Sequence, residues 1–353
     1  PIAEPSSDVE SVGDSSESPD SSAMVAAGGM SALFPAGVGR VSDVWQLVAC
    51  ATDAVSEVPA ARWDLAQLPD AGGGRVPSAV RHGGFVHGAE LHDNGRFGVS
   101  PAEAAAMDPQ QRLVLERGYE ALHAARHERS TLGGSLGGIF LGIAANEFGQ
   151  LLAGTPAGAS VYSATGSSHS IACGRLSYVL GLHGPCISYD TACSAALVAS
   201  HAAVRALQRD ECALALAAGV NLTLAPATGA SFALAGMTSP RGRSHTFDAR
   251  ADGYARGEGV GLCLVGDVGF DQACCAVRHD GASASLTAPN GASQRRLLRC
   301  VAPGDDPALL EAHGTGTALG DPVEVGAASL WTRLRCATAK AVLGHLEAAA
   351  AAL

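Results

Sequence analysis

The chain has 353 residues, 47% of them hydrophobic and only 16% charged, a composition that supports a large buried core and excludes intrinsic disorder, collagen and coiled coil. Its net charge of −11 argues against nucleic acid or an anionic membrane as the main partner. Its 10 cysteines are too few for a disulfide scaffold and include no C-x-x-C pair. We therefore interpret most of them as small buried side chains in a reducing compartment.

The chain begins with an acidic, serine-rich segment. Residues 1–22 contain eight serines, six acidic residues and no basic residue, and we expect this segment to be disordered. Such a start resembles neither a signal peptide nor a transit peptide, so we expect an intracellular protein, cytoplasmic rather than organellar. A helix is predicted at about residues 41–54, and residues 70–95, which are rich in glycine and histidine, are expected to form a long surface loop.

Strands and helices are predicted to alternate through the middle of the chain. Asp108 and Pro109 have the order of a helix cap and first turn, which predicts a helix from there to about residue 126. Buried strands are predicted at 137–144 and 212–224, a short strand at 186–190, and helices at 167–180 and 194–208. The alternation predicts an α/β fold with helices covering the sheets.

One uncharged stretch, residues 212–237, is long enough to suggest a membrane span. Glycine, proline, asparagine and several hydroxyl residues interrupt it. We interpret it as a buried strand, a turn and the start of a helix, and we expect no membrane span.

Cys193 is the first candidate for chemistry. It lies between the end of a predicted strand and the start of a predicted helix, where unpaired backbone N–H groups and the helix dipole favour a thiolate. Its small neighbours Ala192, Ser194 and Ala195 leave room for a bulky electrophile. A buried structural cysteine is the alternative, and position alone does not decide between the two.

Two histidines follow, each on a glycine-rich turn. His313 lies in the segment Glu-Ala-His-Gly-Thr-Gly-Thr (residues 311–317), which resembles a phosphate-binding loop but lacks the required pattern. His345 follows Gly344 and opens an alanine-rich helix. Either histidine alone would be unremarkable, but one cysteine and two histidines on such turns favour thiol-based acyl chemistry. A cysteine protease needs no second Gly-His turn, and no metal-ligand cluster or nucleotide motif is visible.

Several long motifs, running from about Met24 to the end of the chain, resemble the β-ketoacyl synthase family and in particular the ketosynthase domains of modular polyketide synthases. The matching segments are MDPQQR (107–112), DTACS (190–194), DGYARGEG (252–259), TAPNG (287–291), EAHGTGT (311–317), GDP (320–322) and GHLEAAA (344–350). The resemblance implies a thiolase-like fold of layered helices and sheets (αβαβα), usually as a homodimer. It also implies an N-terminal half (23–265) that carries Cys193 and a C-terminal half (266–353) that carries both histidines.

The resemblance further implies a reaction and its residues. Cys193 would accept an acyl chain from an acyl carrier protein, and a malonyl-type extender on that carrier would lose CO₂ and attack the acyl-cysteine. His313 and His345 would stabilise the enolate oxyanion. Thr315 and Thr317 would contact the phosphopantetheine arm, which the carrier protein supplies, and the chain itself would need no metal or cofactor. Lys340 would pair with Glu324 and hold the histidine loop.

The resemblance also leaves alternatives. A fatty-acid-type ketosynthase shares this chemistry, whereas a thiolase would require a second catalytic cysteine. A ketosynthase-like module that only dimerises or binds carrier protein is favoured by the end at Leu353, inside the helix after His345, since we expect the second half to be truncated there. Cys193 argues against that module. The family's usual asparagine before the last Gly-His is Val342 here, which removes polar support next to His345.

Overall fold

The computed structural model describes residues 26–68, 74–266, 275–302 and 307–350. Its strands are β1 (Ala26–Leu33), β2 (Ser56–Glu57), β3 (His82–Gly84), β4 (Gly137–Gly142), β5 (Cys186–Tyr189), β6 (Leu214–Asn221), β7 (Arg256–Gly257), β8 (Gly259–Gly266), β9 (Leu309–Glu311) and β10 (Arg335–Ala337). Its α-helices are α1 (Val41–Ala49), α2 (Arg75–Ala79), α3 (Pro101–Ala106), α4 (Pro109–Ala124), α5 (Arg129–Leu132), α6 (Glu147–Ala153), α7 (Ser163–Ser167), α8 (His169–Leu180), α9 (Ala195–Gln208), α10 (Pro226–Leu234), α11 (Gly291–Val301), α12 (Gly320–Ala328) and α13 (Lys340–Leu343). Short 3₁₀ turns lie at Pro35–Gly37, Leu65–Gln67, Pro156–Ala159, Ala192–Ser194 and Glu347–Ala349.

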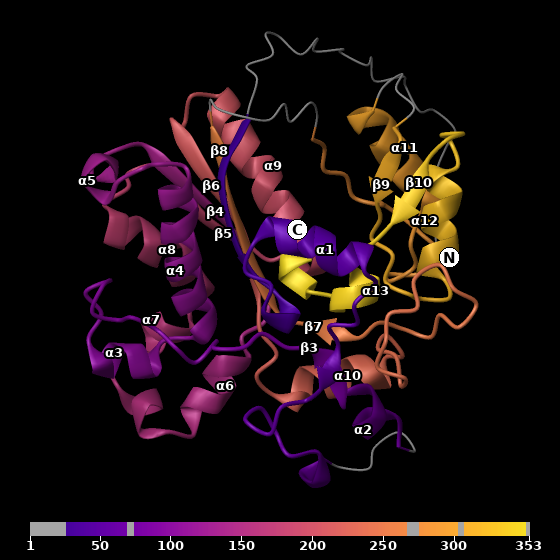
Figure 1. Ribbon diagram of the computed structural model, residues 1–353, viewed down its shortest axis with the longest axis horizontal. Helices are drawn as coiled ribbons and strands as arrows, with labels where there is room; N and C mark the ends of the chain where they lie inside the picture. The colour runs from indigo at the N-terminus through magenta and orange to yellow at the C-terminus, as the bar shows by residue number, and fades with distance from the viewer. Residues whose placement is uncertain (1–25, 69–73, 267–274, 303–306, 351–353) are drawn as a thin grey trace, which may run out of the picture.

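A mixed sheet of five strands, in the order β1-β8-β6-β4-β5, is formed by strands between residues 26 and 266. Strands β4, β5 and β6 run parallel, whereas β8 is antiparallel to both β6 and β1. Helices α4 and α8 pack on one face and α9 on the other (Figure 1). The predicted strand and helix alternation between residues 109 and 224 is therefore confirmed, apart from shifts of a few residues at the ends.

The two faces of this sheet are buried by alternate side chains. Ile139 and Leu141 of β4 belong to the core under α4 and α8, while Phe140 belongs to the core under α9. Such alternation follows from the two-residue period of a strand, and burial on both faces explains why β4 and β6 are apolar throughout. The sheet thereby fixes the end of β5, from which the chain turns into α9.

The C-terminal part of the chain contributes elements outside the five-stranded sheet. Strands β9 and β10 pair in parallel, and α11 packs against α12 in the yellow and orange part of Figure 1. A third sheet, β2-β3-β7, is connected to the segment after α13, because Arg256 of β7 forms a bridge with His345. Segments distant in sequence thus meet at the ends of β5, β7 and α13.

The expected surface loop at 70–95 is wrong in part. The structure places α2 and β3 inside it, with Val76 and Phe85 buried. Its glycines allow close approach of backbones rather than flexibility: a Cβ on Gly84 would lie 2.1 Å from the carbonyl oxygen of Leu343. The close contact supports α13 just before His345.

Three other expectations concern the ends of the chain, membrane spans and cysteines. The predicted disordered segment 1–22 lies outside the described residues. The stretch 212–237 forms β6, a turn and α10, and none of the described helices is long and apolar enough to span a membrane. Of the nine cysteines in the described part of the chain, only Cys173 and Cys212 are fully buried, so the expectation of mostly buried cysteines is wrong.

Candidate active site

Cys193 lies in the 3₁₀ turn between β5 and α9. The residue before it, Ala192, has φ 53°, in the left-handed region that side chains other than glycine rarely adopt. Asp190 supports the turn by accepting a hydrogen bond from the backbone N–H of Ala192 (3.2 Å). Backbone strain held in place by the surrounding structure is typical of functional positions.

The acidity of Cys193 differs from the sequence-based expectation of a favoured thiolate. Burial raises the pKa of the Cys193 thiol above its usual range, and the carboxylate of Glu347 raises it further. The backbone N–H of Cys193 and the ammonium group of Lys340 lower the pKa, but the effect of burial is larger. The thiol is therefore mostly protonated at pH 7 before a substrate binds.

His313 lies in the loop between β9 and α12. Two carboxylates stabilise the backbone of this loop. Glu324 accepts hydrogen bonds from the backbone N–H groups of His313 and Gly314, at 2.6 and 2.8 Å. Asp321 accepts from those of Gly316 and Thr317, at 3.1 and 3.3 Å. Gly314 has φ 45°, and a Cβ there would lie 2.7 Å from a methyl carbon of Thr246, so this position requires glycine.

His345 enters the site from the turn after α13. Its backbone N–H donates to the carbonyl of Ala255 (2.7 Å), and its carbonyl accepts from the N–H of Gly257 (2.8 Å). The side chain is 3% exposed and packs edge-on against the ring of Tyr254, with centroids 4.9 Å apart. Its Nδ1 is buried and has no hydrogen-bond partner among the described residues.

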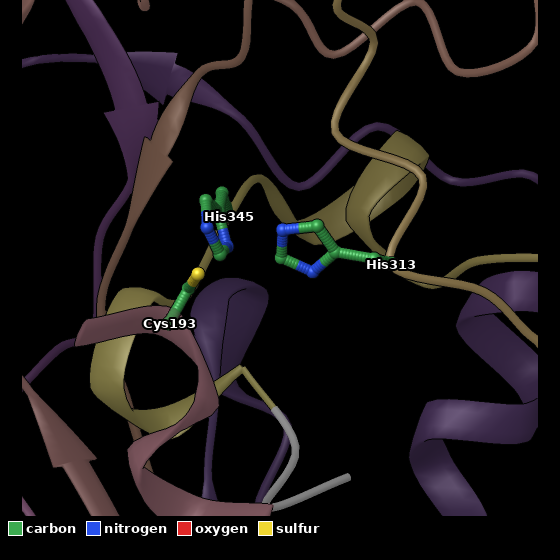
Figure 2. A group of neighbouring side chains, drawn as sticks. All are labelled: Cys193, His313 and His345. Atoms are coloured by element: carbon green, nitrogen blue, oxygen red, sulfur yellow. The ribbon is translucent and has the colours of Figure 1, made fainter. Parts of the chain in front are cut away.

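The structure brings the three predicted residues together. The Cys193 sulfur and one ring nitrogen each from His313 and His345 all lie within 4.8 Å of one another. Figure 2 shows the sulfur directed at His345, while His313 extends from its own loop toward the same point. The two imidazole rings meet edge-to-face, with centroids 5.4 Å apart.

Both imidazoles are neutral at pH 7. Burial and the charge of Lys340 lower the pKa of His313 to about 4, although the side chain is still reached by solvent. The pKa of the fully buried His345 is lowered further below its usual range, by burial and then by the neighbouring His313, Lys340 and Arg256. A neutral imidazole offers one N–H donor and one nitrogen lone pair.

The expected ion pair between Lys340 and Glu324 is absent: within the described residues these two side chains do not come within 4 Å. The backbone of the His313 loop uses both oxygens of Glu324 instead. Lys340 is buried, and burial lowers its pKa, while Glu311, Glu324 and Cys193 act in the opposite direction. The role expected of the pair, holding the histidine loop, is thus performed by Glu324 through backbone bonds.

The two threonines predicted to contact pantetheine differ in burial: Thr315 is buried and Thr317 is half-buried. Thr315 is buried, with its hydroxyl 3.3 Å from that of Thr317. Thr317 lines an open hollow of about 490 Å³, together with Phe247 and Pro322.

A buried ionic network behind His345 was not predicted. Arg256 binds both carboxylate oxygens of Glu347 and also contacts Glu147, which accepts from the backbone N–H groups of Leu224 and Ala225. The sequence does contain a signal, since Arg256 is a charged residue within a glycine-rich run that leads into the buried strand β8. Sequence reasoning places it in a motif without giving it a role.

Comparison with known proteins extends over nearly the whole chain. Residues 23–267 match the family model "Beta-ketoacyl synthase, N-terminal domain", and residues 272–353 match "Beta-ketoacyl synthase, C-terminal domain". A phenolphthiocerol/phthiocerol polyketide synthase of Mycobacterium tuberculosis is 41% identical over 92% of this chain. The pikromycin polyketide synthase component PikAII of Streptomyces venezuelae is also 41% identical over 92% of the chain.

These relatives are much longer than the chain, which spans 23% of the mycobacterial protein and 9% of the Streptomyces protein. Among solved structures, the ketosynthase from module 6 of the bacillaene synthase of Bacillus subtilis 168 superposes with a TM-score of 0.81 at 33% identity. The match covers 93% of this chain and 59% of that one. The likeness confirms the expected thiolase-like α/β fold.

Proposed function

Because the chain belongs to the β-ketoacyl synthase family, with modular polyketide synthases as relatives, we propose that it catalyses the decarboxylative condensation that elongates a polyketide chain. Its substrates would be an acyl thioester and a malonyl-type thioester, both carried by the phosphopantetheine arm of an acyl carrier protein. The observation that carries the proposal is the meeting of Cys193, His313 and His345 within 4.8 Å.

In the first step the Cys193 thiolate attacks the carbonyl carbon of the acyl thioester. A sulfur–carbon bond to Cys193 forms, the carrier thiol leaves, and the proton of the Cys193 thiol passes to that leaving thiolate. A thiol suits this role because it is a good nucleophile and a good leaving group in the second step.

In the second step the extender loses CO₂ and leaves an enolate, whose oxygen needs hydrogen-bond donors. The neutral rings of His313 and His345 can each donate one N–H to that oxygen. The enolate carbon then attacks the acyl-cysteine carbonyl, and the Cys193 thiolate leaves. Loss of one preorganised donor typically costs about 2.7–4 kcal/mol of transition-state stabilisation.

The arm that brings each substrate would enter along the hollow beside Thr317, with Phe247 at its wall. The hydroxyl of Thr315 lies 3.3 Å from that of Thr317, and we expect it to contact the arm together with Thr317. Glu324 would act as a positioning residue, because its bonds fix the backbone of His313. Lys340 would supply positive charge near the thiolate.

We also propose that two copies associate through the edge strand β5. One side of β5 has no neighbouring strand in the five-stranded sheet, and Ile187 in it is exposed. Val161 and Tyr178 are exposed as well, at 88% and 87%. Light scattering of the purified chain should give twice the monomer mass.

We also propose that the chain is divided at about residue 265 into an N-terminal half that carries Cys193 and a C-terminal half that carries His313 and His345.

Intact mass spectrometry tests the proposed function. The chain is incubated with a short acyl thioester of N-acetylcysteamine, and Cys193→Ala serves as the control. One acyl adduct that is absent from the variant supports the proposal. CO₂ release from a malonyl thioester should then fall about 100- to 1,000-fold in His345→Ala. No adduct on a chain with native circular dichroism would refute the catalytic function.

A further inference from the structure

The three candidate catalytic residues also form a set of metal-binding donors. Thiolate and imidazole are the ligands that Zn²⁺ prefers in proteins, and Cys193, His313 and His345 supply one sulfur and two ring nitrogens. These donors come from three separate segments, near α9, β9 and α13, so the fold rather than a sequence motif assembles them. A C-x-x-C or H-x-x-H pattern is absent from the chain, and sequence spacing could not reveal this set.

The donors are in a suitable state for a metal ion. His313 and His345 each contribute one ring nitrogen to the cluster, and an imidazole binds a metal ion through such a nitrogen lone pair. The buried Nδ1 of His345 has no hydrogen-bond partner in the described part of the chain. His313 is reached by solvent, which gives an ion a route to the site.

We propose that the acyl-free chain binds one thiophilic divalent cation, with Zn²⁺ as the representative ion, through Cys193, His313 and His345, and with water as the fourth ligand. The thiol S–H bond breaks, a Zn–S bond forms, and the proton leaves to solvent. Tetrahedral bonds of about 2.3 Å to sulfur and 2.0–2.1 Å to nitrogen set ligand separations of roughly 3.5 Å. The donor atoms lie within 4.8 Å of one another, so binding requires them to approach the ion by about 1 Å.

One charged neighbour limits the affinity. The positive charge of Lys340 acts on all three donors and repels a cation, although Glu311 and Glu324 offset part of it. The site is therefore weaker than a dedicated structural zinc site. The consequence rests on the proposed function: the bound cation would block acylation of Cys193 reversibly.

Cobalt and zinc titrations of the full chain test this proposal without any substrate. Co²⁺ bound through Cys193 should give a thiolate-to-cobalt charge-transfer band, and Zn²⁺ should displace it at one equivalent per chain. Cys193→Ser should abolish the band, and His313→Ala or His345→Ala should weaken binding roughly tenfold or more. The matched control Cys50→Ser, which changes an exposed cysteine, should leave binding unchanged.

A gain-of-binding variant guards against misfolding as the explanation. Lys340→Met removes the positive charge that opposes the cation, so it should tighten Zn²⁺ binding, which an unfolded chain cannot do. Zn²⁺ should also slow iodoacetamide alkylation of Cys193 but not of Cys50. The proposal is overturned if no cation binds, if the band survives in Cys193→Ser, or if Lys340→Met fails to tighten binding. Because no acyl donor is present, these outcomes are independent of whether the chain condenses thioesters.

Discussion

Replacing Glu347 by glutamine would remove one of the two carboxylates that neutralise the buried Arg256. The side chains of Arg256 and Glu347 are 7% and 13% exposed, and they are joined by two hydrogen bonds, Nε–Oε1 at 2.5 Å and Nη2–Oε2 at 3.0 Å. Removing one partner of a buried ion pair typically costs 3–5 kcal/mol, because the other charge stays buried. Glu147 still contacts Arg256, so we expect the lower end, about 3 kcal/mol.

Urea denaturation followed by circular dichroism measures this loss of unfolding free energy. The matched control is Glu57→Gln, which breaks the pair with Arg81, whose side chains are 57% and 55% exposed. An exposed pair contributes at most about 1 kcal/mol. Equal losses in the two variants would refute the argument that burial makes the Arg256 pair important.

The same substitution, Glu347→Gln, should increase the reactivity of Cys193 even though it lowers the stability of the chain. The Glu347 carboxylate raises the pKa of the Cys193 thiol, so glutamine should lower that pKa and increase the thiolate fraction at pH 7. Alkylation of Cys193 by iodoacetamide should therefore be faster in Glu347→Gln, although the chain is less stable. Slower alkylation of a folded variant would contradict this electrostatic assignment.

Three further predictions follow from single residues. Because burial raises the pKa of Cys193, acylation should accelerate about tenfold per pH unit from pH 7 to at least pH 8.5. Mass spectrometry of samples quenched at several times measures this rate. A flat pH profile would mean that the thiolate already forms at pH 7. Gly314→Ala should lower the unfolding free energy by more than about 1 kcal/mol because of its positive φ, whereas Gly174→Ala, in open space on α8, should raise it by about 0.5–1 kcal/mol; equal effects in urea titrations would be unexpected. Tyr254→Phe should preserve the packing against His345 and leave the decarboxylation rate unchanged, whereas Tyr254→Ala should reduce that rate. A similar loss in both variants would assign the role to the Tyr254 hydroxyl.

The sequence predicted the central elements well because each depends on local patterns. The cap at Asp108 begins α4, with the carboxylate accepting from the N–H of Gln110 at 2.8 Å, and the apolar runs at 137–142 and 214–221 form strands buried on both faces. The glycine-rich stretch around Gly84 does not form the loop expected of it. A glycine that permits close approach and a glycine in a turn look alike in sequence, and only the position of Leu343 separates them.

By itself the sequence determined the three residues of the candidate site, since Cys193, His313 and His345 each lie in a short local motif. Glycines stand beside the two histidines. Only the tertiary structure decided how these residues are charged. Burial at the meeting point of three segments raises the pKa of Cys193 and lowers those of both histidines. Likewise the partners of Glu324 and the network around Arg256 depend on residues distant in the chain, and long-range contacts of this kind leave no local pattern to read.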